Sequence, residues 1–172
     1  MSGNNKLNYT FIGMSGVGKT TYGKKIAQQF QYSFSDTDSI IEKENKISIS
    51  EYININGEKA FLKNEETIIC NTSFQAPHII STGGSVVYSS KIMTYLKSFS
   101  TIVYLTDSIE NIKKRIKEFS KRGVIMKNAK TIEAVFKERE KLYSNYADIT
   151  IKIPDPFNIY KGVDLIVNTL SE

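Results

Sequence analysis

Residues 13–20 have the types and the spacing that hold a phosphate group. They read Gly-Met-Ser-Gly-Val-Gly-Lys-Thr and fit the P-loop pattern G-x-x-x-x-G-K-[ST]. Gly13, Gly16 and Gly18 let backbone amides converge on an anion without a Cβ in the way. Lys19 is then placed to reach the terminal phosphates, and the hydroxyl of Thr20 to ligate Mg²⁺. The alternative interpretation is a glycine turn before an ordinary helix.

The segments on either side of these glycines predict the elements that a phosphate loop needs. The apolar run 9–12 indicates a buried strand before the loop. Tyr22, Ile26 and Phe30 recur every four residues after it, as on the inner face of an amphipathic helix. The free amides at the start of such a helix, together with its dipole, favour a bound phosphate. Strand, loop and helix therefore agree on a phosphate site.

Asp36 and Asp38 form a second candidate site. They stand at the end of a predicted strand, and residues two apart on a strand point the same way. We therefore expect both carboxylates to face the crevice at the strand ends, where open parallel sheets bind ligands. One would hold Mg²⁺ through water, and the other would accept hydrogen bonds from a substrate hydroxyl and take its proton. The alternative is that Asp38 caps the following helix, and the two roles are compatible.

Two further features point toward an acidic ligand. Arg139 falls on the apolar face of a predicted helix over 131–147, and an unpaired buried charge is costly. Its partner is a carboxylate of either the protein or a ligand, because the guanidinium fork matches that group. Residues 81–85, Ser-Thr-Gly-Gly-Ser, follow an apolar run, and glycines there allow a ligand to approach the backbone. Many strands end in glycine, so this second signal is weak alone.

Apolar runs and helical patterns alternate along the whole chain. This alternation predicts one α/β domain over residues 1–172, with a five-stranded parallel sheet covered by helices on both faces. Residues 120–130 have no clear period and carry several basic side chains, so they form either a lid over a nucleotide or an exposed connector. The strands are expected at 8–13, 32–36, 78–82, 100–105 and 148–153, and the helices at 18–30, 38–46, 57–72, 88–97, 108–119, 131–147 and 158–170.

Composition narrows the class of protein. The chain has 172 residues, of which 40% are hydrophobic, so we expect a packed core. The net charge of +5 is modest, which suits phosphate-rich ligands and does not call for nucleic acid. We expect a cytoplasmic protein with no secretion signal and no membrane span. Cys70 is the only cysteine and His78 the only histidine, so we expect no internal disulfide and no metal at the histidine.

The candidate sites, taken in order, resemble the shikimate kinase family. In that family a P-loop is followed by D-x-D, then by G-E-x-x-F-R-x-x-E, then by three glycines after a strand, a lid arginine and an R-x-x-x-Y-like helix. The resemblance covers almost the whole chain, and the ordered set is far more specific than the P-loop alone. The counterparts here are residues 13–20, 36–38, 57–65 and 83–85, Arg122, and residues 139–143.

The resemblance implies an ATP-dependent kinase that needs Mg²⁺. The implied acceptor is a small hydroxylated carboxylate, with shikimate and its 3-phosphate as expected substrate and product, in aromatic amino-acid biosynthesis. The implied fold is that of the P-loop nucleoside-monophosphate kinases, with a substrate-binding segment at about 38–72 and a lid loop at about 119–130. We expect a monomer that acts on a small molecule and binds neither nucleic acid nor membrane.

The same resemblance assigns roles residue by residue. Lys19 would stabilise the transferring phosphoryl group, Asp38 would be the base, and Arg122 would cover the phosphates. The nucleotide-binding set is Gly13, Gly16, Val17, Gly18, Lys19, Thr20, Thr21, Arg115 and Arg122. The metal-binding pair is Thr20 and Asp36, and the substrate-binding set is Asp38, Lys59, Gly83, Gly84 and Arg139.

Two departures from the family pattern fall on the acceptor side. Leu62 stands where the family has an arginine that pairs with the substrate carboxylate, and Glu65 is left without that neighbour. Lys59, three residues earlier on nearly the same helix face, is a candidate replacement. Ser85 replaces the third glycine, where it is strained if φ is positive and otherwise adds a donor facing the substrate. Three hypotheses follow: a divergent shikimate kinase, a kinase of another small polyol or acid, and a non-catalytic nucleotide-binding paralogue.

Overall fold

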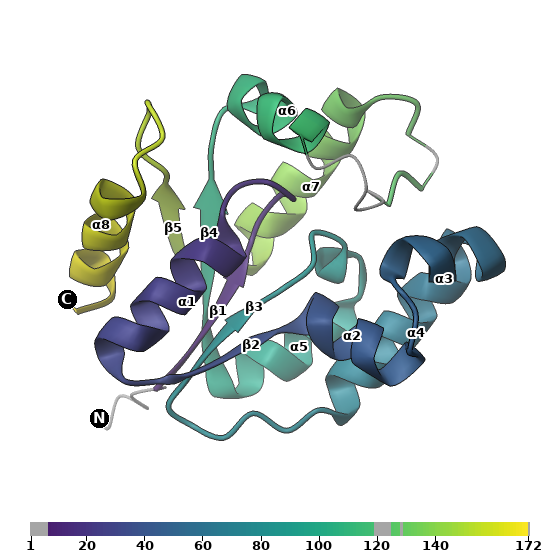
Figure 1. The fold of residues 1–172 in the computed structure, drawn as a ribbon, viewed down its shortest axis with the longest axis horizontal. Coiled ribbons are helices and arrows are strands. Elements are labelled where there is room, and N and C mark those ends of the chain that lie inside the picture. Colours follow the sequence, from purple (N-terminus) through teal and green to yellow (C-terminus); the bar gives the residue numbers. More distant parts are fainter. Residues whose placement is uncertain (1–6, 119–124, 128, 172) are drawn as a thin grey trace.

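Five parallel strands form the centre of the molecule (Figure 1). This computed structural model describes residues 7–118, 125–127 and 129–171. The strand order is β2-β3-β1-β4-β5. The first strand therefore lies in the centre of the sheet, with β3 on one side and β4 on the other. The predicted five-stranded parallel α/β fold is confirmed.

The predicted boundaries agree with the structure to within two residues. The strands are β1 (Asn8–Ile12), β2 (Ser33–Asp36), β3 (His78–Ser81), β4 (Ser100–Thr106) and β5 (Ile149–Lys152). The helices are α1 (Lys19–Phe30), α2 (Thr37–Asn45), α3 (Ile49–Asn56), α4 (Glu58–Asn71), α5 (Ser90–Phe99), α6 (Ile109–Glu118), α7 (Ile132–Tyr146) and α8 (Ile159–Ser171), with a short 3₁₀ turn, η1 (Val86–Tyr88).

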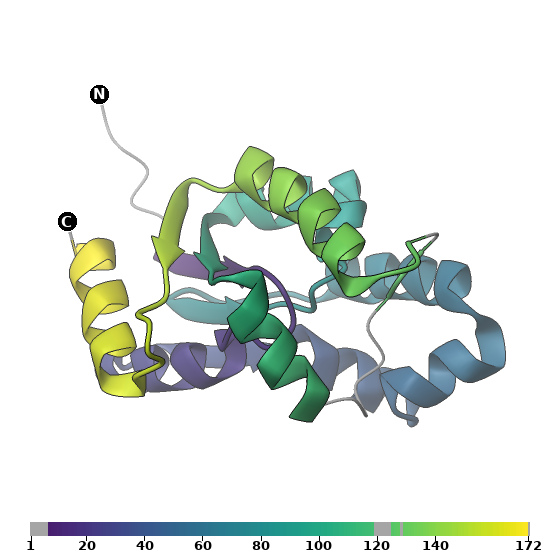
Figure 2. The same ribbon diagram turned by 90° about the horizontal axis from the view of Figure 1, so that it is seen from above.

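Alternating side chains divide the core into two layers. On β1, Ile12 packs in the layer that contains residues of α5 and α7, whereas Phe11 packs in the layer of α1 and α8. Successive strand residues point to opposite faces of a sheet, so a strand buried on both sides needs an apolar residue at each position. Figure 2 shows α1 on one side of the sheet and α5 and α7 on the other.

Helix α3 is the one described α-helix that the sequence analysis did not predict. Its start carries a capping box, in which Ser48 and Glu51 each bond the backbone of the other. That motif was readable in the sequence as Ser followed three residues later by Glu. Helices α2, α3 and α4 lie together at one end of the molecule (Figure 1) and make up the predicted substrate-binding segment 38–72.

Within the part of the chain that the structure describes, none of the helices has the length and apolar character needed to cross a bilayer.

Candidate active site

The loop after β1 has the backbone geometry that its glycines predicted. Gly13, Gly16 and Gly18 all have positive φ. Two features exclude a side chain at Gly13. Its φ is +140°, and a Cβ there would collide with the carbonyl oxygen of Leu105 on β4. Gly18 caps α1 without a side-chain hydrogen bond, so the amides of the first turn stay available to an anion.

Lys19 folds back onto this loop. Its side chain is buried, and Nζ donates to the carbonyl oxygens of Gly13 at 2.7 Å and Met14 at 2.9 Å. The ammonium group is therefore held where the loop would enclose a phosphate. Val17 in the loop is buried, and Thr21 in the first turn of α1 is exposed.

Thr20 and Asp36 meet as the proposed metal pair requires. The Thr20 hydroxyl donates to Asp36 Oδ2 at 2.6 Å, and Ser81 Oγ lies 3.4 Å away. Two neighbouring oxygen ligands from a hydroxyl and a carboxylate suit Mg²⁺, which prefers such hard donors and retains several waters. The residues present thus fit the metal that the resemblance implies.

The expected placement of Asp38 was wrong. Strand β2 ends at Asp36, whose Oδ1 accepts from the amides of Asp38 at 3.0 Å and Ser39 at 3.4 Å. Asp36 is therefore the helix cap, and Asp38 lies in the first turn of α2 and not on the strand. Asp38 still reaches the sheet edge, because its Oδ1 lies 2.5 Å from where a Cβ on Gly83 would stand.

Glu65 is a buried acid beside Asp38 that the sequence did not single out as a site residue. It lies on α4 and is 1% exposed, and its Oε1 borders the same face of Gly83. The Ser85 hydroxyl donates toward both of its oxygens, at 2.9 and 3.0 Å. Burial raises the pKa of Glu65 to about 8, the nearby Asp38 carboxylate adds to the rise, and Ser85 and Arg139 oppose it.

Ser85 adopts an ordinary conformation, so the expected strain does not arise. Its φ is −89°, and neither Gly83 nor Gly84 has a positive φ. Since the hydroxyl is used by Glu65, it does not serve as a free donor toward a substrate.

Arg139 is buried beside Gly84. It is 1% exposed, and Nη1 lies 2.9 Å from where a Cβ on Gly84 would stand. Nε donates to the hydroxyl of Tyr88 at 3.2 Å, and Nη2 donates to the carbonyl oxygen of Ile125 at 2.5 Å. Among the described residues no carboxylate lies within ion-pair distance of it, so its buried charge is not balanced by an ion pair at the Gly84 edge.

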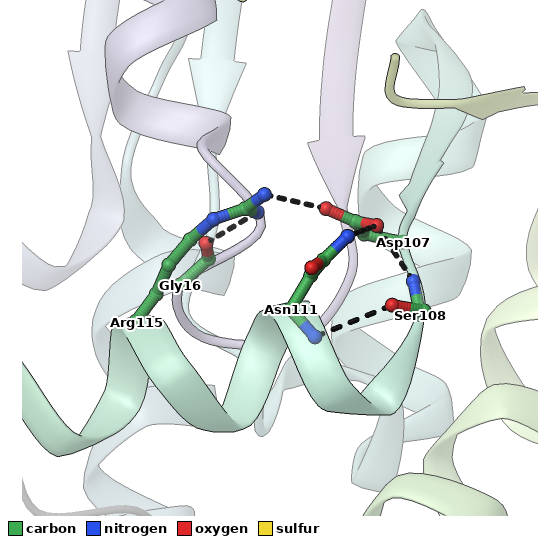
Figure 3. Close-up of polar contacts among 5 residues, drawn as sticks. All are labelled: Gly16, Asp107, Ser108, Asn111 and Arg115. Atoms are coloured by element: carbon green, nitrogen blue, oxygen red, sulfur yellow. Dashed lines mark hydrogen bonds and ion pairs between the residues drawn. The ribbon is translucent and has the colours of Figure 1, made fainter. Parts of the chain in front are cut away.

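Hydrogen bonds hold Arg115 against the phosphate loop (Figure 3). It donates to Asp107 Oδ2 at 2.6 Å and to the carbonyl oxygen of Gly16 at 3.2 Å. Its guanidinium also lies 4.6 Å from the centre of the Phe157 ring. Asp107 in turn accepts from the amide of Ser108 and the side chain of Asn111. Arg115 is therefore part of the surroundings of the phosphate loop.

Lys59 is the one predicted site residue within the described ranges that is not brought into this cluster. Lys59 is exposed on α4, and no contact places it at Gly83 or Gly84. Arg122 lies outside the described residues, as does most of the predicted lid 119–130. The sequence also missed Glu58, whose two oxygens accept from the amides of Met126 at 2.8 Å and Lys127 at 2.7 Å. Nothing local in the sequence signals that contact, which joins positions far apart in the chain.

Comparisons with known proteins agree on one family. Residues 15–159 match the family model described as shikimate kinase. The chain is 35% identical over 154 residues to a shikimate kinase of Buchnera aphidicola subsp. Baizongia pistaciae, covering 87% of this chain and 88% of that protein. It is 32% identical over 169 residues to one of Haemophilus influenzae, covering 95% and 94%. The fold superposes with a TM-score of 0.84 on shikimate kinase from Acinetobacter baumannii in complex with shikimate, at 23% identity and covering 95% and 93%.

Proposed function

The chain belongs to the shikimate kinase family, and on that premise we propose that it transfers the terminal phosphoryl group of ATP to a hydroxyl of shikimate. The observation that carries the proposal is the convergence at one sheet edge of a phosphate loop, Asp38 and a buried arginine. The loop suits a nucleotide, the carboxylate a hydroxyl, and the arginine a substrate carboxylate. Shikimate offers both of the last two groups, and a relative of the same fold was solved in complex with it.

On the nucleotide side, the chain supplies positioning and positive charge. The first-turn amides of α1 and the ammonium of Lys19 would hold the phosphates. Arg115, fixed by Asp107 and beside Phe157, would lie against the base. Arg122 stays a prediction for the lid.

Thr20 and Asp36 would hold Mg²⁺. Thr20 would ligate the ion and Asp36 would hold it through water, since the two oxygens are already 2.6 Å apart. The ion supplies neutralisation of the charge that builds on the transferring phosphoryl group.

On the acceptor side, Asp38 is the proposed base. The acceptor oxygen bonds to the terminal phosphorus, the bond from that phosphorus to the bridging oxygen breaks, and ADP leaves. The hydroxyl proton passes to Asp38. Arg139 and the amide of Gly84 would fix the substrate carboxylate and so orient the hydroxyl. We also propose a single cytoplasmic domain that works as a monomer on this small molecule.

One observation favours a second candidate, a kinase of another small polyol or hydroxy acid. Leu62 is partly buried and apolar where the family's second carboxylate-binding arginine stands. An acceptor with no carboxylate at that point would need no such arginine.

ADP release by the purified protein, with ATP and Mg²⁺ and with or without shikimate, tests the proposal. We expect shikimate-dependent release that is absent in Lys19→Ala, with the product identified as a monophosphate by mass spectrometry. If ATP binds but shikimate gives no stimulation, the acceptor is another compound, and a panel of polyols and hydroxy acids identifies it. If no acceptor gives turnover, the protein is the non-catalytic paralogue.

A further inference from the structure

Glu65 has fewer partners than a buried carboxylate needs. It is 1% exposed, and its one hydrogen-bond partner among the described residues is Ser85. A hydroxyl carries a single proton, so Ser85 satisfies only one of the two oxygens at a time. Among the described residues no lysine, arginine or histidine nitrogen lies within ion-pair distance of Glu65, and burying an unpaired charge is expensive.

The surroundings of Glu65 oppose its negative charge further. A Cβ on Gly83 would touch both Asp38 and Glu65, so the two acidic groups share one small face of the backbone. The nearest opposite charge that acts on Glu65 is Arg139, which sits one residue further on, at Gly84. Two carboxylates facing one arginine would repel an anionic ligand at this edge.

We propose that Glu65, kept uncharged by its burial beside the Asp38 carboxylate, determines that the acceptor pocket takes an anionic substrate. In the uncharged state Glu65 leaves Arg139 free to bind the substrate carboxylate. Its own O–H can then donate to Ser85 Oγ, which satisfies the second oxygen. Ser85 is the positioning residue of this pair. The inference rests on the proposed function, because it names how that site accepts a carboxylate without the family's second arginine at Leu62.

The charged groups that act on Glu65 come from neighbouring helices. The direction of the pKa shift supports the proposal, since burial, the largest cause, and Asp38 both favour the protonated acid. Helices α2 and α7 contribute the charged groups that act on Glu65, which are Asp38 and Arg139. Among the other groups nearby, Glu51 accepts from Ser48, Lys91 pairs with Glu66, and Tyr88 accepts from Arg139 at the site itself.

The first experiment reads the charge of Glu65 directly. The protein is labelled with glutamate carrying ¹³C at the side-chain carboxyl, and the carbon spectrum is followed from pH 4 to pH 10. The spectrum of Glu65→Gln identifies the Glu65 resonance by its absence. We expect a midpoint near the pKa of about 8. A midpoint at the ordinary value of 4.5 would overturn the proposal.

The second experiment measures whether that charge controls substrate binding. KM for shikimate and for ATP is determined between pH 7 and pH 9 in wild type and in Glu65→Gln. With a pKa of about 8, about one tenth of Glu65 stays protonated at pH 9, so KM for shikimate in wild type rises about tenfold. In Glu65→Gln, KM for shikimate changes by less than about twofold between pH 7 and pH 9, since no charge can form at position 65. KM for ATP changes with pH equally in both proteins.

Ser85→Ala supplies an independent check of the same pair. The hydroxyl favours the ionised acid, so its removal moves the rise in KM for shikimate to higher pH. If wild type and Glu65→Gln are both active and their pH profiles of KM for shikimate coincide, the inference about Glu65 is wrong while the proposed function stands. Absence of any shikimate turnover by wild type at pH 7 would overturn the proposed function instead, so the two failures are distinct.

Discussion

Restoring an arginine at position 62 tests how the acceptor carboxylate is recognised. Leu62 lies three residues before Glu65 on α4, and positions with that spacing are neighbours on a helix surface. In Leu62→Arg the new guanidinium therefore starts beside the buried acid. We expect it to ionise Glu65 by pairing with it and to offer its remaining donors to the substrate carboxylate.

The size of the effect follows from the bonds that the change adds. A hydrogen bond to a charged group contributes about 1.5–3 kcal/mol, which corresponds to roughly ten- to a hundredfold in affinity. Because part of the new charge is used by Glu65, we expect the lower end, about a tenfold decrease in KM for shikimate at pH 7. The rise in KM toward pH 9 should also disappear, since Glu65 is then ionised and paired throughout.

The substitution also has a structural cost that must be separated from this gain. Leu62 is partly buried against the core layer of α5 and α7, and exposing part of a leucine costs on the order of 1 kcal/mol. For a chain of this size that lowers the melting temperature by about 2–4 °C. Leu62→Gln removes the same packing without adding a charge, so it is the matched control.

Initial rates of ADP release against shikimate concentration, at pH 7 and pH 9, measure the outcome. We expect Leu62→Gln to lose stability with no decrease in KM, and Leu62→Arg to lose similar stability with the decrease. A folded Leu62→Arg protein with an unchanged KM for shikimate refutes the reasoning. In that case this position of α4 does not face the acceptor carboxylate.

Three further predictions concern other parts of the site and the fold. Asp107→Asn leaves Arg115 without its carboxylate, so KM for ATP should rise about tenfold while KM for shikimate stays unchanged; equal rises in both would contradict the assignment to the nucleotide. Glu58→Gln replaces one of two acceptor oxygens for the amides of residues 126–127, and hydrogen exchange at these amides should become faster there and not in β1. Burial lowers the pKa of His78 below its ordinary 6.5, so the folded state disfavours protonation of this side chain. The stability that neutral His78 contributes is complete above pH 6.5 and is lost as the pH falls toward the lower pKa of the folded state. Thermal melts should show that loss in wild type and a smaller one in His78→Asn.

The phosphate loop was predictable because its determinants are local. Three glycines, a lysine and a threonine within eight residues specify the backbone, and the strand and helix beside them follow from simple periodicity. The pairing of Thr20 with Asp36 was also within reach, because the carboxyl ends of neighbouring parallel strands meet at one edge. The error concerned Asp38, which was treated as a strand residue beside Asp36, whereas it lies in the first turn of α2 behind the Asp36 cap.

The contacts that were missed join distant parts of the chain. Arg139 was expected to pair with a carboxylate of the protein or of a ligand. Within the protein it donates to a tyrosine hydroxyl and a main-chain carbonyl, and no helical pattern reveals those partners. Glu58 reads as an ordinary first-turn acid that complements the helix dipole. Its role in holding Met126 and Lys127 depends on how residues 125–127 return to α4, which is a tertiary property.

Leu62 and Ser85 look like two independent departures when they are read along the sequence. In three dimensions both bear on one side chain, because Leu62 removes the expected cationic neighbour of Glu65 and Ser85 supplies a hydroxyl in its place. A glycine at position 85 would leave both oxygens of a 1% exposed acid without this donor. A leucine at position 62 is thus compatible with a buried Glu65 only if another group satisfies the acid, and Ser85 is in position to do so. The two departures are therefore coupled through Glu65, and the proposed uncharged state of Glu65 accounts for both.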